Sequence, residues 1–81
     1  MTEPRYTIYG KEQCSYCVAA KRELDARGLP YDYHDVMVDL DRRTEMVNRV
    51  PVQVRTVPQI LRGDEYIGGY TELVMTFSEQ D

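Results

Sequence analysis

Two cysteines separated by two residues, Cys14 and Cys17, stand directly before an amphipathic run at residues 18–27. If a helix begins at this pair, the cysteines lie one helical turn apart and the first is at the helix N-terminus. Unpaired backbone N–H groups and the helix dipole favour a negatively charged thiolate there. These are the only cysteines in the chain. The spacing therefore predicts a pair that cycles between dithiol and disulfide and transfers electrons.

The composition limits the class of protein. A chain of 81 residues is long enough for one small core, so we expect a single domain over residues 1–81. The net charge of −4 argues against general nucleic-acid binding, which usually requires a basic face. Residues 1–4 lack the features of a secretory signal, and no stretch is long enough to cross a bilayer. We therefore expect a cytoplasmic protein with no membrane or nucleic-acid partner, in which a C-x-x-C pair is catalytic or metal-binding.

The first half of the chain predicts a strand, a helix and a second strand. Residues 5–9 (RYTIY) are rich in β-forming residues and stop at a glycine. In the helix that follows, Cys17 and Leu24 share one face, and the glycine and proline within residues 28–30 end the helix. In residues 31–36 tyrosines alternate with polar residues, which is typical of an exposed edge strand.

The second half predicts a helix, a hairpin and a last helix. Asp39 or Asp41 can cap a helix that ends near residue 49. Residues 58–62 and 65–67 form a hairpin, whose glycine and aspartate suit a type II′ turn. Two glycines then open the last helix. The order β-α-β-α-β-β-α predicts an α/β fold, with a four-stranded mixed sheet flanked by three helices.

Residues without an evident chemical role are expected in the core. Met37, Met46 and Met75 are interpreted as side chains that fill gaps between the helices and the sheet. The tyrosines are expected in the sheet and the core, apart from Tyr16 and Tyr70, which stand within motifs discussed below.

The two cysteines are expected to have different roles. A thiolate, not a thiol, attacks a disulfide. Cys14 lies at the helix end and nearer to solvent, so it is the expected nucleophile, and the shielded Cys17 is the expected resolving thiol. Lys11 either adds positive charge that favours the Cys14 thiolate or is a solvated loop lysine. The spacing does not separate these two interpretations.

The alternative interpretation of the cysteine pair is half of a zinc site. A structural zinc site needs four ligands, and His34 is the only other good candidate. His34 stands alone on a predicted strand at an odd spacing from the cysteines. We therefore expect an exposed strand residue at this position and no metal site within one chain.

Three motifs resemble those of glutaredoxins. Residues 14–17 (CSYC) resemble the glutaredoxin active site C-P-Y-C, with serine in place of proline. The spacing to residues 56–59 (TVPQ) and then to residues 68–70 (GGY) is also similar, so the resemblance covers nearly the whole chain. It implies a thioredoxin-like fold with a cis peptide bond between Val57 and Pro58, facing the cysteines. It also implies a glutathione-dependent oxidoreductase that reduces protein disulfides and glutathione mixed disulfides.

The resemblance further implies where glutathione binds. The Val57 backbone would pair with the cysteinyl part of glutathione as an added strand. By position, the glutathione-binding residues are Lys11, Tyr16, Arg55, Val57, Pro58, Gly69, Tyr70 and Thr71. Lys11 and Arg55 match residues that hold the glycyl carboxylate, and the glycine-rich segment matches the one that holds the γ-glutamyl end. Many glutaredoxins have aspartate at the Thr71 position, so this departure concerns glutathione affinity, although Glu72 stands next to it.

The same resemblance leaves two alternatives open. Ser15 replaces the family proline, and non-proline sites in the family are sometimes compatible with a [2Fe–2S] cluster that bridges a homodimer through Cys14 of each chain and two glutathiones. A thioredoxin-type carrier, reduced by a flavoprotein reductase, is the other alternative. We expect a monomer with dithiol chemistry, no tightly bound cofactor and glutathione as co-substrate. Glutathionylated or disulfide-containing proteins are the expected partners, with ribonucleotide reductase as a target that the family implies.

Overall fold

The order of elements along the chain is the predicted one. The computed structural model describes residues 5–79. The elements in this part of the chain are β1 (Tyr6–Gly10), α1 (Ser15–Ala26), β2 (Tyr31–Asp35), α2 (Leu40–Arg49), β3 (Gln59–Arg62), β4 (Glu65–Gly68) and α3 (Tyr70–Glu79). The expected boundaries differ from the observed ones by only one or two residues. No helix within these residues is long and apolar enough to span a membrane.

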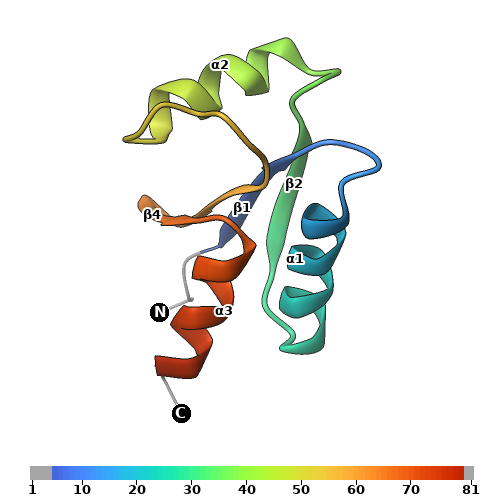
Figure 1. The fold of residues 1–81 in the computed structure, drawn as a ribbon, viewed down its shortest axis with the longest axis vertical. Helices are drawn as coiled ribbons and strands as arrows, with labels where there is room; N and C mark the ends of the chain where they lie inside the picture. The colour runs from blue at the N-terminus through green and yellow to red at the C-terminus, as the bar shows by residue number, and fades with distance from the viewer. Residues whose placement is uncertain (1–4, 80–81) are drawn as a thin grey trace.

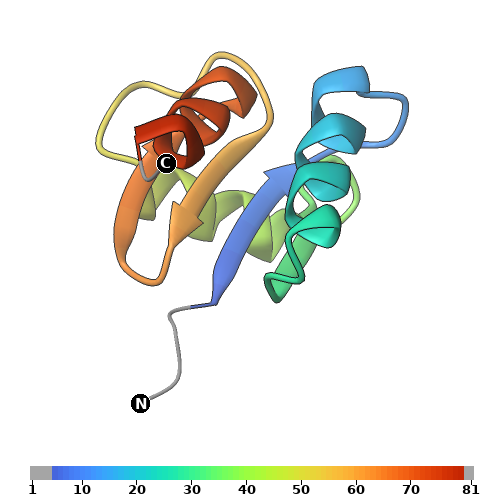
Figure 2. The ribbon, with the colours of Figure 1, turned by 90° about the horizontal axis from the view of Figure 1, so that it is seen from below.

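The strands form one mixed sheet in the order β2-β1-β3-β4 (Figures 1 and 2). β1 runs parallel to β2 and antiparallel to β3, and β3 pairs with β4 as an antiparallel hairpin. A parallel pair needs a crossover connection, which α1 supplies. Gly63 in the hairpin turn has φ 58°, the sign that the first central residue of a type II′ turn requires. The predicted sheet and its edge strand β2 are therefore confirmed.

The helices cover the two faces of the sheet unequally. Helices α1 and α3 lie on one face and α2 lies on the other (Figures 1 and 2). Because side chains alternate along a strand, neighbouring residues of β1 enter different cores. Ile8 packs with Leu24 of α1 and Leu73 of α3, whereas Tyr9 packs with Met46 of α2. Alternation in the central strands thus produces a three-layer arrangement.

Each of the first two helices begins at a side chain that accepts a backbone N–H. Cys14 is the N-cap of α1, and its sulfur accepts from the Cys17 N–H. Asp39 is the N-cap of α2, and its Oδ1 accepts from the Arg42 N–H at 3.2 Å. Of the two aspartates that could cap α2, Asp39 therefore does so. N-cap side chains satisfy donors that the helix leaves unpaired.

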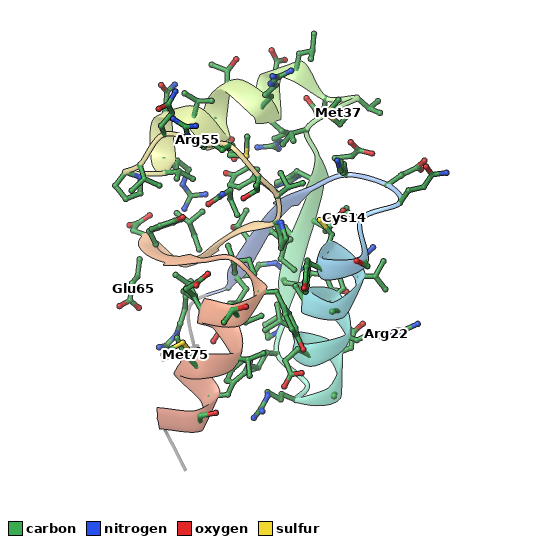
Figure 3. All side chains as sticks on the ribbon, in the orientation of Figure 1. Cys14, Arg22, Met37, Arg55, Glu65 and Met75 are labelled. Atoms are coloured by element: carbon green, nitrogen blue, oxygen red, sulfur yellow. The ribbon has the colours of Figure 1, made fainter. Side chains whose placement is uncertain are left out.

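The expectation that three methionines fill the core is wrong for two of them. Met46 is buried, but Met37 is 62% exposed and Met75 is 54% exposed (Figure 3). Met37 follows the end of β2 in a loop, so no strand periodicity holds it inward. Met75 lies between Leu73 and Phe77, which turn the buried face of α3 toward the sheet. A residue two positions from each of them points away from that face.

Candidate active site

The two cysteines lie at the N-terminus of α1 as free thiols. The Cys14 sulfur accepts the backbone N–H of Cys17 at 3.2 Å and lies 3.8 Å from the Val57 carbonyl oxygen, to which its thiol donates. Cys14 retains 9% of its surface and Cys17 retains none. Cys14 is thus the more accessible of two well-covered sulfurs.

Cys17 faces the interior on the first turn of α1. Burial, and after it the hydrogen bond with Cys14, raises the pKa of its thiol to about 11. The backbone N–H of Lys11 acts in the opposite direction, because a hydrogen bond from a donor stabilises a thiolate. At neutral pH Cys17 is therefore protonated in the dithiol state.

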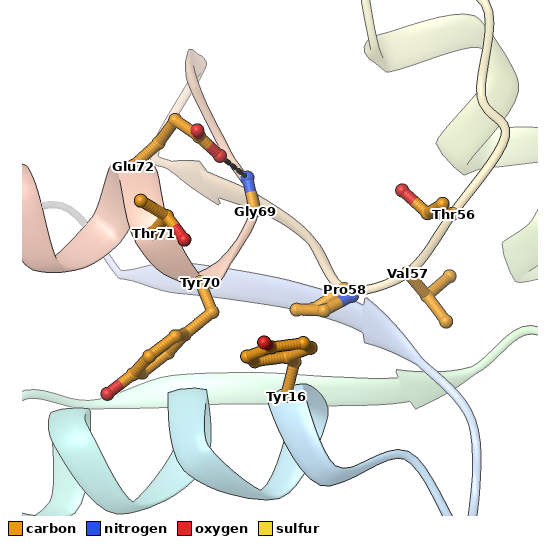
Figure 4. A pocket seen from close by; sticks show the side chains of 8 residues that line it. All are labelled: Tyr16, Thr56, Val57, Pro58, Gly69, Tyr70, Thr71 and Glu72. Atoms are coloured by element: carbon orange, nitrogen blue, oxygen red, sulfur yellow. Dashed lines mark hydrogen bonds between the residues drawn. The ribbon is translucent and has the colours of Figure 1, made fainter.

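A pocket of about 310 Å³ opens beside the cysteines (Figure 4). Its lining residues are Tyr16, Thr56, Val57, Pro58, Gly69, Tyr70, Thr71 and Glu72. The rings of Tyr16 and Tyr70 form one wall, stacked with their centroids 5.9 Å apart. The segment before β3 and the start of α3 form the other walls. We call this space the tyrosine pocket.

Glu72 is the only carboxylate in the lining of the tyrosine pocket. Its Oε1 accepts the backbone N–H of Gly69 at 2.8 Å, as the dashed line in Figure 4 shows. That bond satisfies one of the donors at the start of α3. It also holds the negative charge at the mouth of the pocket, one residue after Thr71.

A second pocket of about 200 Å³ shares Thr56 and Val57 with the tyrosine pocket. Its charged lining residues are all basic: Lys11, Arg43 and Arg55. Thr56 and apolar side chains, Met37 among them, complete the lining. Figure 3 shows Met37 and Arg55 at the end of the molecule that carries α2. We call this space the basic pocket. Val57 lines both pockets, so it lies between an acidic and a basic end.

The structure brings the residues predicted from the sequence together in two groups. The tyrosine pocket contains Tyr16, Val57, Pro58, Gly69, Tyr70 and Thr71, and the basic pocket contains Lys11, Val57 and Arg55. The peptide bond between Val57 and Pro58 is cis, as the resemblance implies. Arg43 was not predicted. It lies on α2 far from every motif, and no signal in the sequence indicates which face of α2 meets the site.

His34 on β2 lies on the side of the sheet that α2 covers. The ring of His34 is half-buried and packs against Tyr9, with centroids 5.7 Å apart, so the expectation of an exposed residue is wrong. Edge-strand alternation did not reveal that α2 covers this side of β2. Within residues 5–79 no three histidine, cysteine, aspartate or glutamate side chains gather as a metal site would require.

Comparisons with known proteins agree on one family. A family model described as glutaredoxin matches residues 6–67. Glutaredoxin 1 of Escherichia coli (strain K12) is 30% identical over 77 residues, covering 89% of this chain and 91% of the relative. The crystal structure of glutaredoxin 1 from Francisella tularensis, complexed with cacodylate, has a TM-score of 0.74 at 32% identity and covers 94% of each chain. A buckwheat glutaredoxin–glutathione complex shares the fold, with a TM-score of 0.78 at 22% identity, covering 96% of this chain and 71% of the other.

Proposed function

The chain belongs to the glutaredoxin family and is a thiol-disulfide oxidoreductase with the redox pair Cys14 and Cys17, and we propose that glutathione is its co-substrate. Its substrates are then protein disulfides and mixed disulfides between proteins and glutathione. The observation that carries the proposal is the place of the Cys14 sulfur, 3.8 Å from the carbonyl oxygen of Val57. Val57 in turn lines both the tyrosine pocket, which contains the Glu72 carboxylate, and the basic pocket. A peptide with charged groups at both ends fits such an arrangement.

Cys14 is the nucleophile in this proposal. The Cys17 N–H and the dipole of α1 stabilise negative charge on its sulfur, and a thiolate is the attacking species. The accessibility of Cys14 and the full burial of Cys17 support this division of roles. Cys17 is then reached only from within the protein, which suits a resolving thiol.

The reaction proceeds by two exchange steps. The Cys14 thiolate attacks a target sulfur, forms a mixed disulfide and releases the other target sulfur as a thiolate, which takes a proton from solvent. With a protein disulfide, Cys17 loses its proton and attacks the Cys14 sulfur, which releases the second target thiolate and closes the Cys14–Cys17 disulfide. Two glutathione molecules then restore the dithiol and leave as glutathione disulfide.

Glutathione extends across both pockets in this proposal. Its cysteinyl part pairs with the backbone of Val57 in the manner of an added strand. Its γ-glutamyl carboxylate binds at the N-terminus of α3. Its ammonium group pairs with Glu72, which supplies the negative charge that Thr71 cannot. The glycyl carboxylate meets Lys11 and Arg55, with Arg43 as a third cation. The buckwheat glutaredoxin, which was solved as a complex with glutathione, supports this site by its similar fold.

Replacing each cysteine tests the roles. We expect Cys14→Ser to abolish all turnover, because no other accessible thiolate remains. Cys17→Ser is expected to keep reduction of a small glutathionylated substrate, since glutathione itself resolves that intermediate, but to lose reduction of a protein disulfide. Equal loss of both activities in the two variants would contradict the assignment. Circular dichroism of each variant is the control for folding.

Ribonucleotide reductase is the protein target we propose on family grounds, in the cytoplasm. The test is deoxyribonucleotide formation by ribonucleotide reductase supplied with this protein, glutathione, glutathione reductase and NADPH. Product formation that depends on Cys14 and Cys17 is expected. Formation at the rate seen without the protein would reject this target and leave the reduction of glutathione mixed disulfides untouched.

A further inference from the structure

Tyr33 on β2 reaches the buried side of the cysteine pair, and the reaction described above gives it no role. A methyl group added to Gly10 would come within 2.5 Å of the Tyr33 hydroxyl oxygen and 2.9 Å of the Cys17 sulfur. Both atoms therefore lie against the same glycine at the end of β1, where only the absence of a side chain leaves room for them. The hydroxyl donates to the Lys11 carbonyl oxygen at 2.9 Å.

Besides Cys14, two groups near the Cys17 sulfur act on the pKa of its thiol. They are the backbone N–H of Lys11 and the hydroxyl of Tyr33. A tyrosine hydroxyl has one proton and two lone pairs, so it can accept from a thiol while it donates to a carbonyl. If the sulfur becomes a thiolate, rotation about the C–O bond turns the same proton toward the sulfur. The Lys11 N–H is fixed by the backbone and needs no rotation.

We propose that Tyr33 is a positioning residue for Cys17, whose hydroxyl turns from the Lys11 carbonyl to the Cys17 sulfur during the resolving step. This inference rests on the proposed function, because it concerns the second exchange of that reaction. Cys17 gives its proton to solvent and attacks Cys14. The Cys14–Cys17 bond forms, and the bond from Cys14 to the target sulfur breaks. The target leaves as a thiolate, which takes up a proton from solvent.

The groups around Tyr33 favour a protonated hydroxyl that donates a hydrogen bond over a phenolate that acts as a base. Burial raises the pKa of the hydroxyl, and the nearby Cys17 charge raises it further, so Tyr33 keeps its proton at neutral pH. Lys21 places its Nζ 4.1 Å from the centre of the ring, where a cation withdraws electron density and strengthens the donor. The other titratable groups that face Tyr33 are Cys14 and Asp35.

Tyr33→Phe removes the hydroxyl and keeps the ring under Lys21. The reduced protein is mixed with glutathione disulfide, quenched with acid at intervals and analysed by mass spectrometry. We expect formation of the Cys14–glutathione mixed disulfide at the wild-type rate and conversion to the Cys14–Cys17 disulfide about tenfold more slowly, as the loss of one hydrogen bond to a charged sulfur predicts. The rise of this second rate with pH should also move to higher pH. Tyr31→Phe is the matched control, because Tyr31 lies on the same strand as Tyr33 and its hydroxyl donates to Asp25 of α1 at 3.3 Å.

Two results would overturn the inference. The first is a Tyr33→Phe variant that closes the disulfide at the wild-type rate with the same pH dependence. The second is a variant in which both steps slow together and the melting temperature falls, since Tyr33 would then have only a structural role. Failure of the proposed function looks different, because the wild-type protein itself would form no mixed disulfide at Cys14.

Discussion

At the scale of single residues, one helix terminus gives two sulfurs opposite environments. Cys14, as the N-cap of α1, accepts a backbone N–H and lies 3.8 Å from the carbonyl oxygen of Val57, a residue that lines both pockets. Cys17, one turn later, is fully buried, and burial raises its pKa to about 11. The difference arises from position along the helix, because Cys14 caps its open end, whereas Cys17 lies about one turn further along the axis, on the buried face of α1. The proposed nucleophile and the proposed resolving thiol therefore differ in position and not in residue type.

Glu72 supplies the residue-scale prediction. Glu72→Gln keeps an oxygen that accepts the Gly69 N–H. It removes the negative charge that, in our proposal, pairs with the ammonium group of glutathione. We expect the KM for a small glutathionylated substrate to rise about fivefold with kcat nearly unchanged, the upper range for an exposed ion pair. Steady-state kinetics measures both constants. Glu65→Gln, at an exposed glutamate of β4, is the control for the change in net charge. A KM equal in the two variants would contradict the role of Glu72.

At the scale of elements, a polar cluster joins α2 to the sheet. The hydroxyl of Tyr9 on β1 donates to Glu45 of α2 and accepts from Arg49 at 3.1 Å. Arg49 also donates to the carbonyl oxygen of Gly63 in the hairpin turn at 2.8 Å. These bonds connect α2, β1 and the turn between β3 and β4. They hold the helix whose Arg43 lines the basic pocket.

Glu45→Gln tests that cluster through its pH dependence. The hydrogen bond from Tyr9 and the charge of Arg42 lower the pKa of Glu45 below its ordinary value of 4.5. A lowered folded-state pKa stabilises the fold above the ordinary value, and this contribution is lost as the pH falls through the folded-state pKa. We expect the variant to lose about 1 kcal/mol of unfolding free energy at neutral pH, less than a fully buried hydrogen bond to a charged group would contribute, because Glu45 is partly exposed.

Urea unfolding of Glu45→Gln and wild type at neutral and acidic pH measures the difference. It should shrink once the pH lies well below the ordinary carboxyl range. A difference that stays constant over that range would show that the charge of Glu45 contributes nothing. Glu65→Gln changes a carboxylate with no side-chain hydrogen bond or ion pair to any residue of the described part of the chain, and it is expected to match the wild type at both pH values.

The sequence predicts the elements well, because local signals mark each of them. The glycine that ends β1, the Asp39 cap and the hairpin turn at Gly63 are read from neighbouring residues. Contacts between distant segments carry no such signal. The half-buried His34 depends on the placement of α2 over β2, and Arg43 depends on which face of α2 meets the segment before β3. The site was therefore predicted where motifs define it and missed where packing defines it.

At the scale of the whole molecule, two pockets of different charge flank the same backbone segment. Val57 separates the tyrosine pocket, with its single carboxylate, from the basic pocket, whose charged residues are Lys11, Arg43 and Arg55. Three separate parts of the fold supply them: the loop after β1, helix α2 and the segment before β3. Such a polarity suits a small peptide with an ammonium group at one end and a carboxylate at the other. It supports the proposal of a glutathione-dependent enzyme over that of a carrier that a flavoprotein reduces by surface docking.

Reduction of the Cys14–Cys17 disulfide by glutathione and, in a separate reaction, by thioredoxin reductase tests this account most directly. The oxidised protein is mixed either with glutathione, glutathione reductase and NADPH, or with thioredoxin reductase and NADPH, and free thiols are counted over time. The account predicts that glutathione restores the dithiol rapidly and that thioredoxin reductase leaves the disulfide intact. Rapid reduction by thioredoxin reductase together with no reduction by glutathione would contradict it.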